Sequence, residues 1–236
     1  MIEKLLDEYE LKARVAPGVI LILPVLVDAA YAVPALSNWP IFAAGGICCL
    51  ALLYGLGHVV RARGKAIEND LWISWDGPPS TRFMRDRDRF FDASLKTSIK
   101  AAVSHRFSVS LLSKAEESSD PGRADRVIAD AFRRVREFLR KHDSGGLWNK
   151  NNADYGFCRN LLGCRFIWTM LAAAATVFAI VVGIERKAGA FNVASAIGFA
   201  SFDCAVYVGW MVLPDATRRT AERYAELAWI AFAETE

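Results

Sequence analysis

The sequence predicts an all-α integral membrane protein, in which four transmembrane helices in two hairpins bracket a mainly helical cytoplasmic domain. Three observations favour this fold class. The hydrophobic residues, 53% of 236, are concentrated in four runs instead of being spread along the chain. Each run is close to the roughly 20 residues with which an α-helix crosses a bilayer. Lys and Arg gather at one end of each hairpin, as they do in membrane proteins with a fixed orientation.

The four predicted spans are residues 15–36, 41–60, 166–184 and 188–213. The first contains one charge, Asp28, the fourth contains Asp203, and the other two contain none. Helices satisfy their own backbone hydrogen bonds, so such runs can cross hydrocarbon. Buried helices of a soluble protein, one alternative, would be shorter and carry polar stripes. A cleavable signal peptide, the alternative for the first run, is disfavoured because acidic residues precede it and a second span follows within five residues.

The distribution of Lys and Arg predicts the orientation of the spans. The connection SNWP contains neither residue, and the connection after the third span has only Arg186 and Lys187 beside Glu185. The opposite ends of the spans carry many more, namely Lys12, Arg14, Arg61, Arg63, Lys65, Arg159, Arg165, Arg218, Arg219 and Arg223. Both termini and the central segment are therefore predicted to face the cytoplasm.

These boundaries divide the chain into four regions. Residues 1–60 form an N-terminal cytoplasmic segment and the first hairpin, 61–165 a cytoplasmic helical domain, 166–213 the second hairpin, and 214–236 a cytoplasmic amphipathic tail. The central region is basic, with 21 Lys and Arg against 14 Asp and Glu. The tail is predicted to be a helix with Tyr224, Leu227 and Ala231 on one side.

Within the central region, the pattern is mainly helical. The second span is predicted to continue as a helix to Trp75 and to stop at Asp76-Gly-Pro-Pro, because proline lacks the backbone donor. Ser80 or Thr81 can cap a new helix. A polar loop is expected over 113–122 and a helix with one apolar stripe up to His142, while the alternation over 107–111 allows a short strand. The apolar residues of the helix after Ser80 are Phe83, Phe90, Phe91, Leu95, Ile99, Ala102 and Val103.

The stretch RFMRDRDRFFD has two interpretations. If it is helical, three pairs form on a solvated face, Arg82 with Asp86, Arg85 with Asp88, and Arg89 with Asp92. Alternatively it is an anion site for a nucleotide-sized ligand, since guanidinium groups bind phosphates bidentately and tryptophans can stack on a base. No GxxxxGK[ST] phosphate loop occurs. The candidate ligand-binding residues are Trp72, Trp75, Arg82, Arg85, Arg87 and Arg159.

The predicted helix 123–141 is itself rich in basic residues. Acidic lipid is a better candidate partner for this basic face than nucleic acid, because the other face of the helix is needed for packing. Nucleic acid is therefore not an expected partner.

Asp28 and Asp203 lie inside predicted spans. A charge at mid-bilayer costs at least about 2.5 to 3.5 kcal/mol on insertion scales, so such residues face a bundle interior or an aqueous path. The alternative is that both are protonated or hydrogen-bonded structural residues. Nearly opposite Asp203 the fourth span carries a stripe of small residues, which lets helix backbones approach closely. Both faces then need neighbours, which predicts a homo-oligomer. The stripe is Ala194, Gly198, Ser201, Ala205 and Gly209.

No catalytic residue, metal ligand or cofactor is predicted, and the chain is expected not to be an enzyme. Neither GxSxG nor HExxH occurs, and His58, His105 and His142 are far apart. The five cysteines include no CxxC pair and no Cys/His cluster suited to zinc.

Three segments carry a resemblance: WISWDGPPSTRFMRDRD from Trp72, YGFCRNLLG over 155–163, and RTAERYAE over 219–226. They resemble signatures of poorly characterised bacterial four-span inner-membrane proteins, some of which look like membrane effectors of anti-phage, abortive-infection systems. The resemblance implies that the cytoplasmic domain senses a nucleotide second messenger or a signalling protein, and that oligomeric spans permeabilise or depolarise the membrane. The alternatives are a non-enzymatic scaffold that docks a cytoplasmic partner protein, and a membrane-bound enzyme or transporter that uses Asp28 and Asp203.

Overall fold

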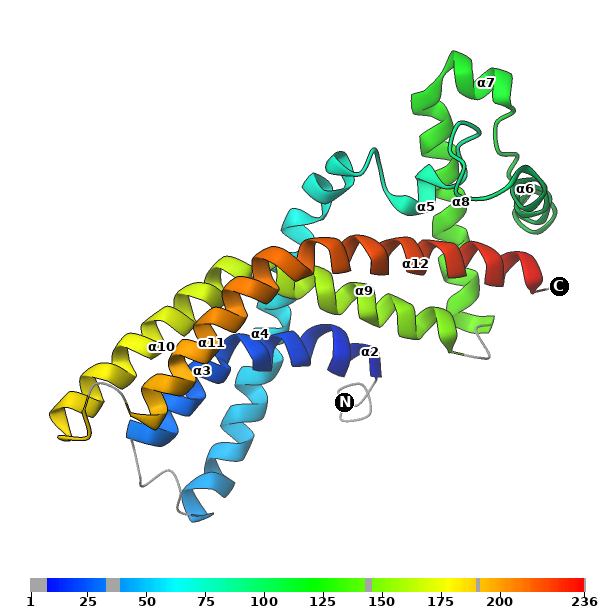
Figure 1. Cartoon of the computed structure of the whole chain (residues 1–236). Coiled ribbons are helices and arrows are strands. Elements are labelled where there is room, and N and C mark those ends of the chain that lie inside the picture. The colour runs from blue at the N-terminus through cyan, green and yellow to red at the C-terminus, as the bar shows by residue number, and fades with distance from the viewer. Residues whose placement is uncertain (1–7, 33–38, 143–145, 190–191, 236) are drawn as a thin grey trace. The chain divides into compact units, whose positions relative to one another are not determined.

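The computed structural model of the chain describes residues 8–32, 39–142, 146–189 and 192–235, with side chains given for 9–32 and from residue 52 onward, and these residues are helical apart from short connections (Figure 1). Two π-helical turns, η1 (Leu11–Val15) and η3 (Tyr207–Val212), join α2 to α3 and α11 to α12 without a break. The α-helices are α2 (Glu8–Glu10), α3 (Ala16–Ala32), α4 (Trp39–Ser74), α5 (Pro79–Arg82), α6 (Ala93–Phe107), α7 (Lys114–Ser119), α8 (Pro121–His142), α9 (Leu147–Gly163), α10 (Arg165–Glu185), α11 (Val193–Val206) and α12 (Leu213–Glu234).

The chain forms two compact units. We call Met1–Ile67 with Ala153–Arg218 the span unit, and Glu68–Asn152 with Arg219–Glu236 the polar unit. Helices α4, α9 and α12 each contribute residues to both.

The span unit contains apolar helices long enough to cross a membrane. In the described part of the chain there are three, Leu11–Ala32, Arg165–Glu185 and a window of the continuous run Val193–Glu234. At most 33% of each apolar window is buried inside the protein, and large side chains such as Leu23, Val177 and Val193 point outward. Such a surface suits hydrocarbon better than water. By length and composition, these three candidate spans suggest a multi-pass membrane protein.

The predicted second span, 41–60, lies in the first half of α4, which is helical as expected. The side chains of residues 39–51 lie outside the described part of the structure. The count of four spans therefore stays a prediction.

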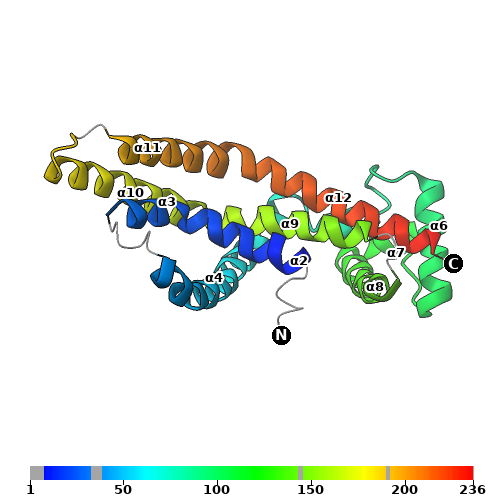
Figure 2. The same ribbon diagram turned by 90° about the horizontal axis from the view of Figure 1, so that it is seen from below.

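Helices α10 and α11 form a hairpin and lie side by side in both views (Figures 1 and 2). A Cβ atom on Gly198 would lie 2.9 Å from the Cα of Thr176, and one on Gly209 would lie 3.3 Å from the Cβ of Arg165. The small-residue stripe of α11 does allow close approach of helix backbones, as predicted. Its neighbour, however, is α10 of the same chain, so this stripe gives no argument for an oligomer.

Within the span unit, helix α9 packs closely against the start of the first span and against α4. A Cβ on Gly156 would lie 2.9 Å from the Cβ of Ala13, and one on Gly163 would lie 2.7 Å from the backbone N of Gly64. Between these glycines, Asn160 Nδ2 donates to the carbonyl of Ala13 at 2.7 Å. Ala13 lies in the π-helical turn η1, and Asn160 satisfies its carbonyl from another helix. The segment YGFCRNLLG thus forms a packing junction.

In the polar unit, α8 ends at His142 and buries the predicted apolar stripe. Phe132 of this stripe contacts α12, with ring centroids 5.2 Å from Trp229 and 6.0 Å from Tyr224. The tail helix differs from the prediction in two ways. It continues the fourth span through Pro214, which lies inside the continuous run Val193–Glu234, two residues after the π-helical turn η3. Its buried face is Ala221, Tyr224, Ala225, Ala228, Trp229 and Phe232, whereas Leu227 and Ala231 are half-buried.

The predicted long helix after Ser80 is wrong. Helix α5 has four residues, residues 83–92 form turns, and α6 begins at Ala93. Asp92 is the cap of α6, and its Oδ1 accepts from the backbone N of Leu95 at 2.9 Å. The cap of this helix is therefore Asp92, eleven residues after Thr81 and twelve after Ser80, the two predicted caps.

Two smaller expectations for the polar unit are also wrong. Residues 108–113 are irregular and not a strand, because Ser108 ends α6 in a left-handed conformation with φ of 54°. The expected loop over 113–122 contains α7, which begins with a capping box between Ser113 and Glu116.

Candidate ligand site and intramembrane carboxyls

The segment Asp76–Asp92, which we call the arginine loop, begins where α4 ends. The backbone N of Gly77 donates to the carbonyl of Trp72 at 2.8 Å, with Gly77 at φ of 106°. This conformation favours glycine, and a Cβ there would also lie 2.8 Å from Nη2 of Arg85. The glycine thus ends α4 and leaves room for Arg85 beneath the loop.

Arg85 is buried, with 7% of its side chain exposed. Its Nε and Nη2 donate to the two carboxylate oxygens of Asp125, both at 2.8 Å, and its Nη1 donates to the carbonyl of Asp76 at 2.6 Å. The hydrogen bond to Asp125 raises the pKa of Arg85 further above its usual range. Arg85 therefore ties the loop to α8, and its guanidinium is already occupied by a carboxylate.

Two more buried charges hold the backbone of the arginine loop. Lys96 Nζ donates to the carbonyl of Arg85 at 2.5 Å and also to the carbonyl of Asp88. Glu117 accepts from the backbone N of Asp86 at 3.0 and 3.1 Å. Burial lowers the pKa of Lys96, while the carboxylate of Asp88 opposes this. Side chains therefore satisfy backbone groups that a helix would have paired internally.

Arg82 is also engaged within the polar unit. Its Nη2 donates to Glu222 Oε1 at 2.8 Å, its Nη1 to the carbonyl of Trp75 at 3.2 Å, and its Nε lies 3.4 Å from Asp88. The helical pairs expected along this stretch are therefore wrong. The observed partners come from α8, α12 and the loop itself, because residues 83–92 are not helical.

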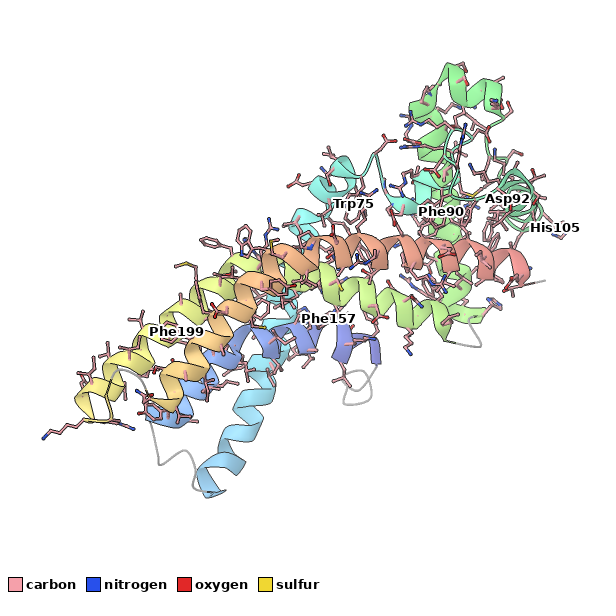
Figure 3. The ribbon with its side chains drawn as sticks, viewed as in Figure 1. Trp75, Phe90, Asp92, His105, Phe157 and Phe199 are labelled. Atoms are coloured by element: carbon pink, nitrogen blue, oxygen red, sulfur yellow. The ribbon has the colours of Figure 1, made fainter. Side chains whose placement is uncertain are left out.

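The remaining predicted ligand-binding residues are placed differently. Trp75, labelled in Figure 3, is only 8% exposed, and Trp72 is half-buried. Arg87 is exposed and pairs with Asp76 at 3.1 Å. Arg159 belongs to the span unit, where it is buried and donates to Oδ1 of Asn160 at 3.0 Å. The structure thus brings the arginines of the loop together with Trp75, and Arg159 is part of the junction around Asn160.

Beside the arginine loop lies an open cavity of about 610 Å³. Its floor holds the buried Arg85 and Glu117, and three cations lie on its rim: Arg87, Arg89 and Lys114. In the part of the chain that the structure describes, the side chains of Arg89 and Lys114 have no hydrogen-bond or ion-pair partner. The rim cations can hold an anion, because the charged groups of the floor already have partners of their own. The cavity is lined by Arg85, Asp86, Arg87, Arg89, Lys114, Glu117, Ser118, Pro121 and Asp125.

Sequence reasoning missed Lys114, and it paired Arg89 with Asp92. It also missed Lys96, Glu117 and Asp125 as the groups that hold the loop. The spacing of these three residues from the arginine loop in the sequence shows no helical or strand period. They reach the loop because the turns and α7 bring them beside it.

The two intramembrane aspartates have different surroundings. Asp28, in α3, is 6% exposed, yet it has no hydrogen-bond or ion-pair partner among the described residues. Asp203, in α11, is exposed, and its carboxyl likewise has no partner within that part of the chain. No group of three His, Cys, Asp or Glu residues in the described ranges could hold a metal ion.

Comparisons of the chain with protein-family models, with curated proteins and with solved structures found no match.

Proposed function

We propose that the chain is an effector of the bacterial inner membrane, in which the polar unit detects a cytoplasmic signal and the spans of several copies permeabilise or depolarise the bilayer. The observation that carries this proposal is Asp28. A buried carboxyl with no partner among the described residues, within an apolar helix, is costly, and such groups mark ion or proton paths in membrane proteins.

The finer topology has four spans, with both termini and the polar unit on the cytoplasmic side. It rests on the Lys and Arg flanks and on the helical conformation of 41–60. Reporter fusions after Lys65 and at Glu236 should behave as cytoplasmic, and a fusion within SNWP as periplasmic. A periplasmic signal at Lys65 would contradict this topology.

The signal is an anionic ligand held at the rim of the cavity beside the arginine loop. Arg82 and Arg85 are occupied by carboxylates inside the fold, so the recognising cations are Arg89 and Lys114. Arg87 joins them, because its ion pair with Asp76 is exposed to water and is therefore weak. A nucleotide or an acidic segment of a signalling protein has the required charge. Three segments resemble poorly characterised bacterial four-span inner-membrane proteins, some of which look like membrane effectors of anti-phage systems. This resemblance supports a role in abortive infection.

The test is membrane potential during induced expression, read with a potential-sensitive dye, with and without phage. Asp28→Asn keeps the shape and most hydrogen bonding but removes the charge, so we expect less depolarisation at equal protein level in the membrane. Asp215→Asn changes an exposed aspartate two residues beyond the predicted fourth span, 188–213. It is the matched control and should depolarise like the wild type. If wild-type expression leaves the potential unchanged in every condition, a non-enzymatic scaffold that docks a cytoplasmic protein is the better description.

A further inference from the structure

The exposed position of Asp203 requires something other than lipid against α11. Two contacts indicate the depth of Asp203 along the spans. Gly198 packs on Thr176 and Gly209 packs on Arg165, and Asp203 lies between these two glycines along the helix. Thr176 and Arg165 both belong to the candidate span Arg165–Glu185. A carboxyl at this depth that faces hydrocarbon carries a large insertion cost, so this face of α11 is covered by protein.

The same face carries a strip of small side chains. Ala196, Ala200 and Cys204 follow each other at every fourth residue, and all three are exposed. Phe199, labelled in Figure 3, lies on the other flank of Asp203 and is also exposed. Small residues at this spacing let a second helix come close enough for its backbone to touch. This strip is separate from the stripe that packs on α10.

The polar groups on this face complement one another. Asp203 offers carboxylate acceptors, and Tyr207, one turn further on, is 64% exposed and offers a hydroxyl donor. A face that presents both a donor and an acceptor is self-complementary under two-fold symmetry, in which residue i contacts j and j contacts i.

We infer that a second copy of this chain packs against the face of α11 formed by Ala196, Ala200, Asp203 and Cys204, together with Tyr207 at the start of η3. Ala200 lies at the closest approach of the two helices, and Asp203 of each copy accepts a hydrogen bond from Tyr207 of the other. The inference rests on the membrane placement in the proposed function and names the assembly surface that the proposed function requires.

Disulfide crosslinking in native membranes tests this surface. The background is the full chain with its five cysteines replaced by alanine, and Ala200→Cys is the probe. Ala174→Cys is the matched control, because Ala174 is an exposed alanine of α10 two residues from Thr176, and therefore at a similar depth. With copper phenanthroline as oxidant, Ala200→Cys should give a band at twice 26.1 kDa that contains two differently tagged copies, and Ala174→Cys should not.

The hydrogen bond is tested in the Ala200→Cys chain. Tyr207→Phe and Asp203→Leu should each lower the crosslinked fraction at limiting expression about four- to ninefold. Either change removes both bonds of the symmetric pair, and an average hydrogen bond between membrane helices is worth about two- to threefold. The combination of both changes should lower the crosslinked fraction no further than Asp203→Leu alone, since both changes remove the same two bonds. Unchanged crosslinking in both single variants overturns the pairing of Asp203 with Tyr207.

Three outcomes overturn the surface itself: equal crosslinking from Ala174→Cys, no dimer band from Ala200→Cys, or a band of another mass. Each is scored only in membranes washed at alkaline pH, so that integration is established first. Loss of the chain in that wash contradicts the membrane placement, and hence the proposed function, instead of the choice of interface.

Discussion

The two units are stabilised by opposite means. In the span unit, helices meet through glycines, and backbones approach until an added methyl group has no room at Gly64, Gly163 and Gly198. In the polar unit, an irregular loop is held by buried charges, with Arg85, Lys96 and Glu117 bonded to backbone and carboxylate groups. Apolar helices in hydrocarbon gain nothing from burial and depend on close packing. A loop that leaves water must instead have its polar groups satisfied.

This contrast predicts which substitutions each unit tolerates. The span unit should be sensitive to added volume at its helix crossings. The polar unit should be sensitive to removal of a single buried charge, because the partner group is then left without compensation.

The largest effect is expected for Gly64→Ala. Its Cβ would lie 2.2 Å from Oδ1 and 2.7 Å from Cα of Asn160, and the latter is backbone that cannot move aside. We expect a loss of about 3 to 5 kcal/mol in the free energy of unfolding, measured by denaturation in detergent. Gly55→Ala is the matched control on the same helix, since nothing lies within 4 Å of its Cβ position. It should be neutral or stabilise by up to about 1 kcal/mol. Equal stability of the two variants would contradict the close crossing of α4 and α9.

Arg85→Met should lower the stability of the polar unit by about 3 kcal/mol, the low end for a broken buried ion pair. The low end applies because Asp125 keeps 38% of its side chain exposed and can rehydrate. Arg87→Met is the control, since Arg87 pairs with the same Asp76 from an exposed position and should cost under about 1 kcal/mol. Thermal unfolding followed by tryptophan fluorescence measures both. If Arg85→Met costs no more than Arg87→Met, then Arg85 does not hold the loop.

Asn160→Ala should cost about 2 kcal/mol, because the buried carbonyl of Ala13 loses its donor from α9. Asn151→Ala, on the same helix, removes an exposed bond to the carbonyl of Leu147 and should change stability by less than about 0.5 kcal/mol. Denaturation in detergent again provides the comparison. A neutral Asn160→Ala variant would mean that water replaces the amide at η1.

The sequence predicted the apolar runs well, because hydropathy and charge are summed over many residues. The apolar stripe of α8, the stop of α4 at Asp76-Gly-Pro-Pro and the close packing of the Gly198 stripe were read from local patterns. The conformation of the arginine loop was not predicted from its local pattern. Phe83, Phe90 and Phe91 have helical spacing, but they belong to turns, and the Asp92 cap together with the long-range donor Lys96 outweighs that spacing.

The same reason explains the outcome for the candidate sites. Arg82 and Arg85 stand beside aspartates in sequence, yet their partners, Glu222 and Asp125, come from other helices. Pairing across a fold depends on which helices meet, and one sequence does not specify that. Asn160 carried a signal that was available, since a polar residue between Gly156 and Gly163 on one helix face indicates a helix junction.

The smallest effect concerns two caps on the surface of the polar unit. Hydrogen bonds from Ser94 and from the backbone N of Leu95 lower the pKa of Asp92 below its usual 3.8, and bonds from Ser113 lower the pKa of Glu116 below its usual 4.5. A lowered pKa in the folded state means that the unfolded chain binds the proton more readily. The stabilisation by each charge is therefore complete above the usual pKa and is lost as the pH falls through the lower pKa of the folded state.

The substitution Asp92→Asn tests this effect, because it keeps a capping oxygen but cannot titrate. It should show nearly the wild-type Tm at pH 6 and a smaller fall in Tm between pH 4 and pH 3, whereas Asp92→Ala should have a lower Tm at both ends. An identical acid response in wild type and Asp92→Asn would show that the ionised carboxylate adds nothing to the cap of α6.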